Sequence, residues 1–460
     1  MELNLKSKII HHTSVVTRYA PSPTGLFHIG AVRTVLFNYC FAKKNGGTMI
    51  LRIEDTDKER SKKEYERDII DGLLWLGIGY DGPHRQSERT EVYKKHLETL
   101  LKEDKVYESP EAEGTVFRFR NPGKTVRFHD AIRGDIESDT KDLGDFVIAR
   151  SLISPLFHFA VVVDDDEMNV SHVIRGEDHI SNTPRQILIQ EALGIARPVY
   201  AHLPLVLAPD KSKLSKRNLT GGMIAVRDYK NAGYLPEAIL NFTALLGWSP
   251  EDGREIFSLD ELVSLFSLDR IQKSGAQFNI QKLRWCNKEH MKNMSDDDFL
   301  KTLVARIPTS LASLPHYSEE RLARAAVTIR ERIEVFADVE DLAQAGELDY
   351  FFVPPRYENP QRISSAKDDG QGAVSTREHI QYIIDTLSSL TEDTWSEETV
   401  KNALWDYATE NGRGNVLWPM RFALSGREKS PDPFTLAKIL GKEETVARLH
   451  AARNALGTLS

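Results

Sequence analysis

Residues 21–31 read PSPTGLFHIGA, a string with two prolines and two glycines around a single histidine. Its prolines and glycines predict a tight turn between a short β-rich run over residues 15–19 and residues 29–43, where apolar side chains have helical spacing. A strand, a turn and a helix in this order are typical of a parallel α/β sheet, in which ligands bind at the carboxyl ends of the strands. The turn is therefore the first place to expect a binding site.

The same turn has residues that suit an anion. Gly30 stands at the predicted start of the helix, where unpaired N–H groups and the helix dipole attract negative charge. His28 can donate a hydrogen bond to a phosphate oxygen. A single His-x-Gly more often marks an ordinary turn with a core histidine, but the complete eleven-residue string favours a phosphate site.

A second motif, KLSKR, occupies residues 213–217. It follows a predicted strand, and the ammonium groups of its lysines can neutralise the charge that develops on a leaving pyrophosphate. A bare K-x-x-K-R is usually a solvated basic loop. Its position after a strand of the same sheet, downstream of His28, favours the nucleotide role instead.

Further strands and helices alternate between these motifs. GGTMILRIEDTD, residues 46–57, predicts a buried strand with an acidic end, and Asp57 is expected to cap the next helix. FHFAVVVDDD (157–166) and SHVIRGEDH (171–179) continue the pattern, followed by a helix over residues 183–193. We expect residues 164–167 to form a solvated turn between two strands, in preference to a Mg²⁺ site.

Two other regions depart from this alternation. TVFRFR (115–120), KTVRFHD (124–130) and DFVIARS (145–151) predict strands of a small inserted region. After KLSKR the chain is predicted to be mainly helical, with a surface loop or linker over residues 349–378.

The composition indicates a soluble globular protein of about three domains, with 460 residues, 40% of them hydrophobic and 28% charged. There is no run of about 18 apolar residues and no long apolar N-terminal segment, so neither a membrane span nor a secretory signal is expected. The two cysteines, Cys40 and Cys286, favour a reducing cytoplasm and cannot make a cysteine-rich zinc site. The net charge of −8 neither supports nor excludes an RNA partner, because RNA binding depends on local basic patches.

Taken together, the motifs resemble one family. TRYAPSPTG, FHIG, LRIEDTD, SHVIRGEDHISNTPRQ, KLSKR, GYLPEAILNF and KLRW are similar to segments of the bacterial-type glutamyl-tRNA synthetases, which are class I aminoacyl-tRNA synthetases. The resemblance is dense over residues 15–290 and fainter as far as WPMRFALSG near the C-terminus. It implies a Rossmann-like parallel sheet catalytic domain with a small α/β insertion, followed by an all-helical anticodon-binding region.

The resemblance also implies a division of the chain and a reaction. The catalytic domain would occupy residues 1–86 and 159–224, with the acceptor-end-binding insertion at 87–158, a stem-contact helical domain at 225–292 and the anticodon-binding domain at 293–460. Glutamate and ATP with Mg²⁺ would give glutamyl-adenylate, and the glutamyl group would pass to the terminal adenosine of tRNA(Glu). In this family, activation of glutamate usually requires bound tRNA. A cytoplasmic monomer without zinc and without a membrane partner is expected.

The resemblance also implies roles for individual residues, according to their positions in the motifs. The resemblance assigns catalysis to His28, Lys213 and Lys216. It assigns ATP binding to Thr24, His28, Gly30, Asp178, Leu205, Val206, Lys213 and Lys216. It assigns glutamate binding to Arg18, Ala20, Ser22, Glu54, Phe157 and Arg175. Candidates for contact with anticodon bases are Arg330, Arg332 and Arg421, for which surface charges paired along a helix are an equal alternative.

The sequence departs from the family pattern in two places near the site. The family often has a tyrosine where this chain has Phe157, so one hydrogen bond to the substrate is expected to be lost, at a cost of roughly 0.5–3 kcal/mol. The insertion is short, with only ESPEAEGT (108–115) where the family commonly has a longer helical segment that sometimes carries zinc-binding cysteines.

Several alternatives remain open at this point. The enzyme could also charge tRNA(Gln), depending on how strictly it reads the anticodon. A glutamyl transferase that acts on a modified tRNA base would lack the helical C-terminal region, and glutaminyl enzymes carry β-barrels there. A catalytically silent RNA-binding relative is disfavoured because His28, Lys213 and Lys216 are all present.

Overall fold

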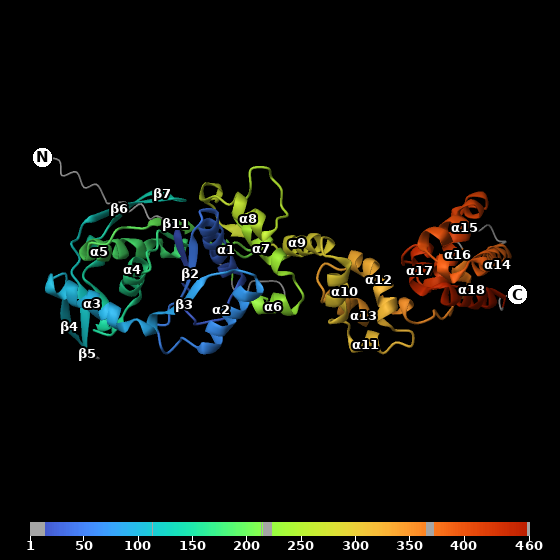
Figure 1. The fold of residues 1–460 in the computed structure, drawn as a ribbon, viewed down its shortest axis with the longest axis horizontal. Coiled ribbons are helices and arrows are strands. Elements are labelled where there is room, and N and C mark those ends of the chain that lie inside the picture. Colours follow the sequence, from blue (N-terminus) through green and yellow to red (C-terminus); the bar gives the residue numbers. More distant parts are fainter. Residues whose placement is uncertain (1–13, 113, 213, 215–222, 365–371, 458–460) are drawn as a thin grey trace. The chain divides into compact units, whose positions relative to one another are not determined.

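Two groups of parallel strands form the centre of the N-terminal part of the computed structural model, which describes residues 14–112, 114–212, 214, 223–364 and 372–457 (Figure 1). The first group contains, in spatial order, β1 (Val16–Tyr19), β2 (Thr48–Ile53) and β3 (Asp81–Arg85). The second group pairs β10 (His172–Gly176) with β11 (Val199–Leu203). The predicted parallel sheet is confirmed.

The two groups meet at β1 and β10. Val16 donates its backbone N–H to Ser171 Oγ at 2.8 Å, and the Ser171 N–H donates to the Val16 carbonyl at 2.9 Å. The chain therefore leaves β1 in one direction, toward β2, and returns on the other side at β10. Such a reversal of strand order opens a crevice at the carboxyl ends of the two strands, where ligands bind in doubly wound sheets.

Helices cover this sheet. α1 packs against β1, β2 and β10, so the helix that follows the PSPTGLFHIGA turn lies across the junction (Figure 1). The predicted helices at residues 29–43 and 183–193 are confirmed, the second with the same bounds. The helices in this part of the chain are α1 (Ile29–Lys44), α2 (Lys63–Trp75), α3 (Thr90–Lys102), α4 (Phe157–Glu167), α5 (Thr183–Leu193), α6 (Val226–Asn231), α7 (Pro236–Leu245), α8 (Leu259–Leu265) and α9 (Ile280–Lys292).

The inserted region is built from antiparallel strands. One sheet contains β4 (Val106–Glu111), β5 (Gly114–Phe119), β8 (Phe146–Ser151) and β9 (Ser154–Pro155). A hairpin of β6 (Thr125–Asp130) and β7 (Gly134–Asp139) joins the β11 edge of the parallel sheet, where Asp130 pairs with Tyr200. The three predicted strands are confirmed as β5, β6 and β8. β4 and β7 were not predicted, because proline and acidic residues lower their strand propensity. Downstream, β12 (Val206–Leu207) pairs with β13 (Ala276–Gln277).

The prediction for residues 157–167 is wrong. These residues form helix α4, and Asp164 and Asp165, expected in a solvated turn, are buried. The run of valines over residues 161–163 has the β propensity of a strand, but α4 packs against α3, α5 and β8, and its residues 159–165 are all buried. A helix buried on all sides shows no 3.6-residue period, so it cannot be told from a buried strand by pattern.

Two smaller predictions also differ from the structure. Asp57 does not cap α2: the N-cap residue is Lys62, and Asp57 accepts a hydrogen bond from Arg60 Nε at 2.6 Å. In the expected loop at 349–378, α14 begins at Gly372, and Tyr350–Phe352 are buried aromatic residues. Burial of these side chains fixes a segment that composition alone marks as a surface loop.

The chain divides into two compact units, residues 1–290 and 291–460. Within its described residues, the second unit is helical, as predicted. Its helices are α10 (Asp296–Val304), α11 (Thr309–Ala312), α12 (Glu319–Arg332), α13 (Asp338–Gln344), α14 (Gly372–Ser389), α15 (Glu397–Glu410), α16 (Arg413–Ser425), α17 (Pro433–Leu440) and α18 (Lys442–Gly457).

A buried ionic cluster ties the first unit together around Arg52, whose side chain is 0% exposed. Arg52 Nη1 donates to Asp165 at 2.7 Å, Nη2 donates to Glu54 at 3.1 Å, and Nε lies 3.8 Å from Asp164. Asp164 also accepts a hydrogen bond from Arg89 at 2.7 Å. The side chains of Tyr93 and Gln86 each donate a further hydrogen bond to it at 2.8 Å. β2, α4 and the start of α3 are therefore linked by charge.

Removing Arg52 is expected to destabilise the protein strongly. Arg52→Ala leaves three buried carboxyl groups without their shared cation, and breaking such a pair costs about 3–5 kcal/mol. We expect a clearly lower melting temperature in thermal unfolding followed by circular dichroism. Arg60→Ala is the matched control, because Arg60 is 76% exposed in its pair with Asp57 and such pairs contribute about 0–1 kcal/mol. Equal melting temperatures for the two variants would contradict this view of the cluster.

Candidate active site

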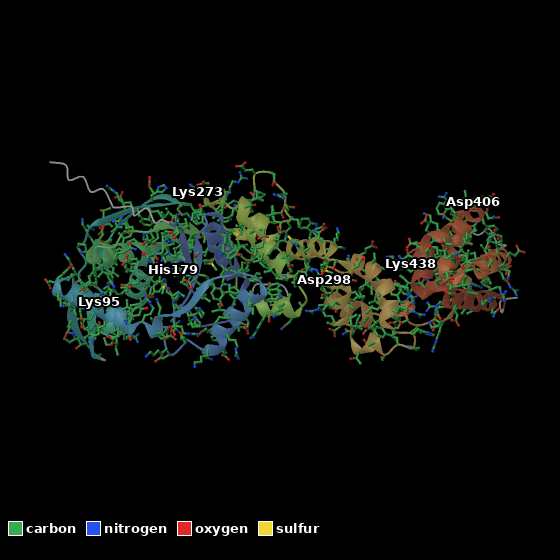
Figure 2. All side chains as sticks on the ribbon, in the orientation of Figure 1. Lys95, His179, Lys273, Asp298, Asp406 and Lys438 are labelled. Carbon is green, nitrogen blue, oxygen red and sulfur yellow. The ribbon has the colours of Figure 1, made fainter. Side chains whose placement is uncertain are left out.

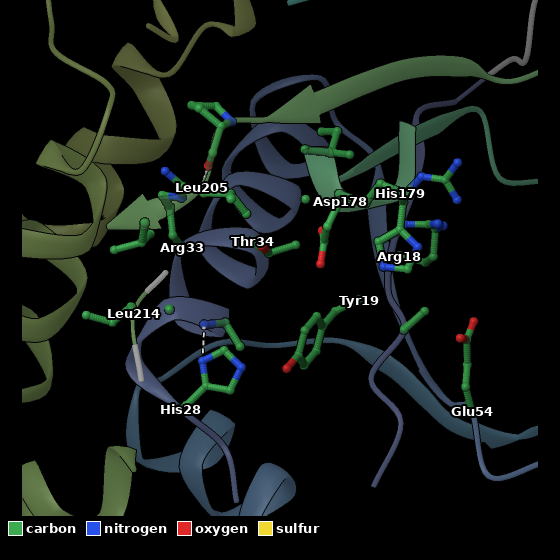
Figure 3. Close-up of a pocket in the computed structure, with 18 of the residues that line it drawn as sticks. Arg18, Tyr19, His28, Arg33, Thr34, Glu54, Asp178, His179, Leu205 and Leu214 are labelled. Atoms are coloured by element: carbon green, nitrogen blue, oxygen red, sulfur yellow. Dashed lines mark hydrogen bonds between the residues drawn. The ribbon is translucent and has the colours of Figure 1, made fainter. Parts of the chain in front are cut away.

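A cavity of about 280 Å³ opens at the carboxyl ends of β1 and β10 (Figure 3). It lies at the predicted place, where the strand order reverses. Most of the residues that the sequence singled out converge here from five separate segments. The predicted site residues that line the cavity are Arg18, Ala20, His28, Gly30, Glu54, Phe157, Arg175, Asp178, Leu205 and Val206.

Two of the described residues predicted to bind glutamate or ATP are not among those that line the cavity. Ser22 and Thr24 are exposed in the turn after β1, where the Thr24 N–H donates to the Ser22 carbonyl at 2.8 Å. Lys213 and Lys216 lie outside the described residues. Leu214, between them in sequence, does line the cavity.

The turn between β1 and α1 presents His28 at the start of the helix. His28 is the N-cap residue of α1, and its Nδ1 accepts the Ala31 N–H at 3.1 Å. Because Nδ1 is an acceptor, the proton of the neutral imidazole lies on Nε2, which can donate to an anion. Gly30 permits this arrangement, since a Cβ there would lie 3.1 Å from His28 Nδ1.

Arg18 and Glu54 place opposite charges at the other end of the cavity, as Figure 3 shows. Arg18 comes from β1 and donates from Nε to Asp165 at 3.3 Å, whereas Glu54 directly follows β2 and accepts from Arg52. Burial raises the pKa of the Glu54 carboxyl above its ordinary value, and the charges of Arg52 and Arg18 oppose that shift. The acid is therefore held among cations and faces a cavity that can accept an ammonium group.

Arg175 supplies a second guanidinium from β10. Its Nη2 donates to Thr183 Oγ1 at 2.9 Å and to Gln186 Oε1 at 2.8 Å, and its Nε donates to His202 Nε2 at 3.1 Å. None of these partners is a carboxylate. Burial lowers the pKa of Arg175 to about 10, so it stays protonated at neutral pH. Its positive charge remains available to an anionic ligand group.

Phe157 starts α4, and its ring centroid lies 5.6 Å from that of His179 and 5.4 Å from that of His158. Burial and the nearby arginine charges lower the pKa of His158 and of His179 to about 4 each. Both imidazoles are therefore neutral at physiological pH. Figure 2 shows His179 inside the first unit, whereas the exposed Lys95 and Lys273 lie toward its rim.

Leu205, which is predicted to bind ATP, lies at the end of the cavity where His28 is found (Figure 3). The Leu205 N–H donates to Glu177 Oε1 at 2.7 Å, and its carbonyl accepts the Ala276 N–H at 3.3 Å. Val206 is buried in β12, and its carbonyl accepts the Leu214 N–H at 3.3 Å. This wall of the cavity is thus fixed by backbone hydrogen bonds.

Sequence reasoning missed several residues of the cavity wall, namely Tyr19, Ala31, Arg33, Thr34, Val161, Ile174, Gly176, His179, Pro204 and Leu214. Helical spacing could have identified two of them. Arg33 and Thr34 lie three and four residues after Gly30, so the three share one face of α1. Arg33 connects α1 to two later segments of the chain. Its Nη1 donates to the Leu246 carbonyl at 3.1 Å, and its Nη2 donates to the Pro204 carbonyl.

The three arginines predicted to contact the anticodon belong to the second unit, and each has a partner there. Arg330 pairs with Asp296 at 2.9 Å, and Arg332 pairs with Glu347. The guanidinium of Arg421 lies 4.6 Å from the centroid of an indole ring. Their contact with RNA stays a prediction.

Together, these groups suit a ligand with two anionic groups and one cation beside a phosphate chain. Arg18 and Arg175 can bind carboxylates, Glu54 can bind an ammonium group, and His28 with the N-terminus of α1 can bind phosphate. In the described residues, no three His, Cys, Asp or Glu side chains are grouped to hold a metal ion. No helix in that part of the chain is long and apolar enough to span a membrane.

Comparison with known proteins agrees with this chemistry. Residues 14–114 and 108–285 match the family model described as tRNA synthetases class I (E and Q), catalytic domain. Residues 298–453 match the model of an anticodon-binding domain. The two models together account for most of the chain, and the cavity lies within the catalytic match.

Relatives match along nearly the whole length. The glutamate–tRNA ligase of Akkermansia muciniphila is 40% identical, over 95% of this chain and 98% of the relative. Glutamate–tRNA ligase 1 of Caldanaerobacter subterraneus is 37% identical, over 96% and 98%. A crystal structure of a glutamate tRNA ligase from Elizabethkingia meningosepticum, in complex with its amino acid, superposes with a TM-score of 0.82 at 32% identity, covering 96% of this chain and 100% of that one. With its catalytic and anticodon-binding parts both matched, the chain belongs to the class I tRNA synthetases of the glutamate and glutamine type.

Proposed function

We propose that the protein joins glutamate to tRNA(Glu) in two steps at the cavity between β1 and β10. In the first step, a carboxylate oxygen of glutamate attacks the α-phosphorus of ATP, and the bond to the β-phosphate oxygen breaks to release pyrophosphate. In the second step, a hydroxyl of the terminal adenosine of tRNA attacks the carbonyl carbon of the adenylate, and AMP leaves. The observation that carries the proposal is the pairing of Arg18, Arg175 and Glu54 at one end with His28 at the other.

Glutamate has the charges that the first end of the cavity requires. Arg18 and Arg175 bind its side-chain carboxylate, for which the planar guanidinium fork is well suited. Glu54 binds its ammonium group, Ala20 and Phe157 border the substrate, and Ser22 is proposed to reach it from the adjoining turn. Glutamine lacks the negative charge, so binding it would leave the buried Arg175 guanidinium without a carboxylate partner.

ATP occupies the second end. The N–H groups at the start of α1 and the Nε2–H of His28 bind phosphate oxygens, with Thr24, Gly30 and Asp178 nearby. Leu205 and Val206 border the base. Lys213 and Lys216 neutralise the charge that passes to pyrophosphate. ATP brings Mg²⁺, which usually keeps waters and binds phosphate oxygens with few protein ligands.

The remainder of the chain handles the tRNA. Residues 87–158 contact the acceptor end, 225–292 the stem, and 293–460 the anticodon, with Arg330, Arg332 and Arg421 as candidates. The match of residues 298–453 to an anticodon-binding domain favours a ligase over a transferase that acts on a modified tRNA base. The helical second unit disfavours a glutaminyl enzyme. A cytoplasmic monomer is the proposed form, and charging of purified tRNA(Glu) and tRNA(Gln) side by side decides whether both are substrates.

Pyrophosphate exchange tests the first step. We expect exchange between labelled pyrophosphate and ATP that depends on glutamate, measured with and without tRNA(Glu). Lys216→Ala should lower the rate about 10²-fold, because one group that stabilises the developing charge is lost. The absence of exchange under both conditions in the wild type would overturn the proposed function, and a wild-type rate in the variant would overturn the role of Lys216.

Arg175→Lys tests how the glutamate carboxylate is bound. Lysine keeps the charge but loses the planar fork, so the KM for glutamate should rise about tenfold or more while the KM for ATP stays unchanged. Both constants are measured in the exchange assay. An unchanged KM for glutamate would show that Arg175 does not bind this substrate.

Phe157→Tyr tests the departure of this pocket from the family pattern. The added hydroxyl is expected to supply a hydrogen bond to glutamate worth about 0.5–1.5 kcal/mol, which corresponds to a KM lower by about 2- to 10-fold. Phe157→Leu is the companion variant, since it changes the ring without adding a donor. A KM for glutamate that is unchanged or raised by the tyrosine would contradict a direct contact at this position.

A further inference from the structure

Behind Arg175, two buried side chains form a line that leads away from the cavity. His202 and Asp130 are both 0% exposed. His202 Nε2 faces Arg175 Nε at 3.1 Å, and His202 Nδ1 lies 2.6 Å from Asp130 Oδ2. The three residues come from β10, β11 and β6, which are neighbouring strands. Arg175, which lines the cavity, is therefore hydrogen-bonded to His202, and His202 is in turn hydrogen-bonded to Asp130 of the inserted hairpin.

The proton positions in this line follow from the identity of the groups. A guanidinium has only N–H donors, so the His202 nitrogen that faces Arg175 must be the acceptor. The single proton of the neutral imidazole then lies on Nδ1 and is donated to Asp130, whose carboxylate can only accept. Asp130 thus selects the tautomer of His202 that can receive Arg175.

Asp130 is itself held firmly. Its Oδ1 accepts the backbone N–H groups of Ile132 at 3.0 Å and of Arg133 at 2.8 Å, and the His202 N–H donates to Oδ2 at 3.1 Å. Burial raises the pKa of Asp130, but these bonds and that from the His202 ring outweigh it, so the net shift is downward. The carboxylate is a fixed, ionised end of the line.

The line aligns Arg175 without cancelling its charge. Arg52 is surrounded by three carboxyl groups, whereas among the described residues Arg175 donates hydrogen bonds to an imidazole, a hydroxyl and an amide oxygen and lies over the Tyr200 ring at 5.6 Å. The carboxylate that orders this contact lies one imidazole farther away. A guanidinium held by neutral acceptors keeps its attraction for an anion in the cavity, while its orientation is fixed.

We propose that Asp130 and His202 are positioning residues that orient the Arg175 guanidinium toward the side-chain carboxylate of the amino-acid substrate, with Asp130 acting by keeping the His202 proton on Nδ1. This inference rests on the proposed function of Arg175. If it holds, loss of the His202 tautomer that carries its proton on Nδ1 weakens glutamate binding and leaves ATP binding intact.

Asp130→Asn is the direct test. The amide can donate to His202 Nδ1, which moves the imidazole proton to Nε2 and opposes the Arg175 N–H. A buried N–H that faces another donor loses its hydrogen bond, so we expect the KM for glutamate to rise about tenfold in the exchange assay with an unchanged KM for ATP. Asp135→Asn is the matched control, because Asp135 pairs with His129 on the same hairpin but is 93% exposed. An unchanged KM for glutamate in Asp130→Asn, or equal increases in both KM values, would overturn the proposal.

A double-mutant cycle separates this inference from the proposed function. If Asp130 acts through Arg175, adding Asp130→Asn to Arg175→Lys should raise the KM for glutamate much less than it does in the wild type. Full additivity would overturn the positioning role. If Arg175→Lys alone has no effect on that KM, the assignment of Arg175 fails instead.

Substitution of His202 tests the same contact with Asp130 intact. The side-chain oxygen of His202→Gln can still accept the Arg175 Nε–H, whereas His202→Leu removes the acceptor. We expect the KM for glutamate to rise less in the glutamine variant than in the leucine variant, with melting temperatures recorded for both. Equal KM values for the two variants would contradict the proposal, since a merely structural imidazole does not require an acceptor at this position.

Discussion

The buried charge of Arg52 is the constraint on which the catalytic unit depends. Its guanidinium is completely enclosed, and the three carboxyl groups around it raise its pKa even though burial opposes this. No member of the cluster can leave without exposing another buried charge to an apolar surrounding, and that requirement fixes β2 against α4. Arg18 extends the cluster to β1 through Asp165, and Arg89 extends it to the start of α3 through Asp164.

The cluster also sets the electrostatics of the site. Asp165 and Glu54 are shared with Arg52, so neither fully neutralises the groups that face the cavity. Arg175 is instead held by neutral acceptors, so no carboxylate is hydrogen-bonded to it among the described residues. This asymmetry suits an amino acid with a second carboxylate. An anion placed between Arg18 and Arg175 neutralises positive charge that the protein's own carboxylates do not neutralise.

Sequence was sufficient to predict the site where its residues stand at the ends of strands. Arg18 and Arg175 lie near the carboxyl ends of recognisable strands and Glu54 directly follows one, and parallel strands bring their carboxyl ends together. The sequence could not show that α4 is a helix, because burial on all sides removes the helical period. Asp164 and Asp165 were therefore expected in solvent. Burial of a charged residue can be predicted only when its partner is known. Here the partner, Arg52, lies more than a hundred residues away in the sequence.

Distance along the sequence also explains why no pattern indicated a role for Asp130 and His202. Asp130 ends an unremarkable strand of the insertion, and His202 lies in an apolar run of β11. Only pairing of β6 with the edge of the parallel sheet brings them together. Residues 108–111 and 114–115, in the stretch that is expected to be short, belong to the other sheet of that region, in β4 and β5. The hairpin that supports Arg175 is therefore separate from the shortened segment, so a reduced insertion is compatible with an intact amino-acid pocket.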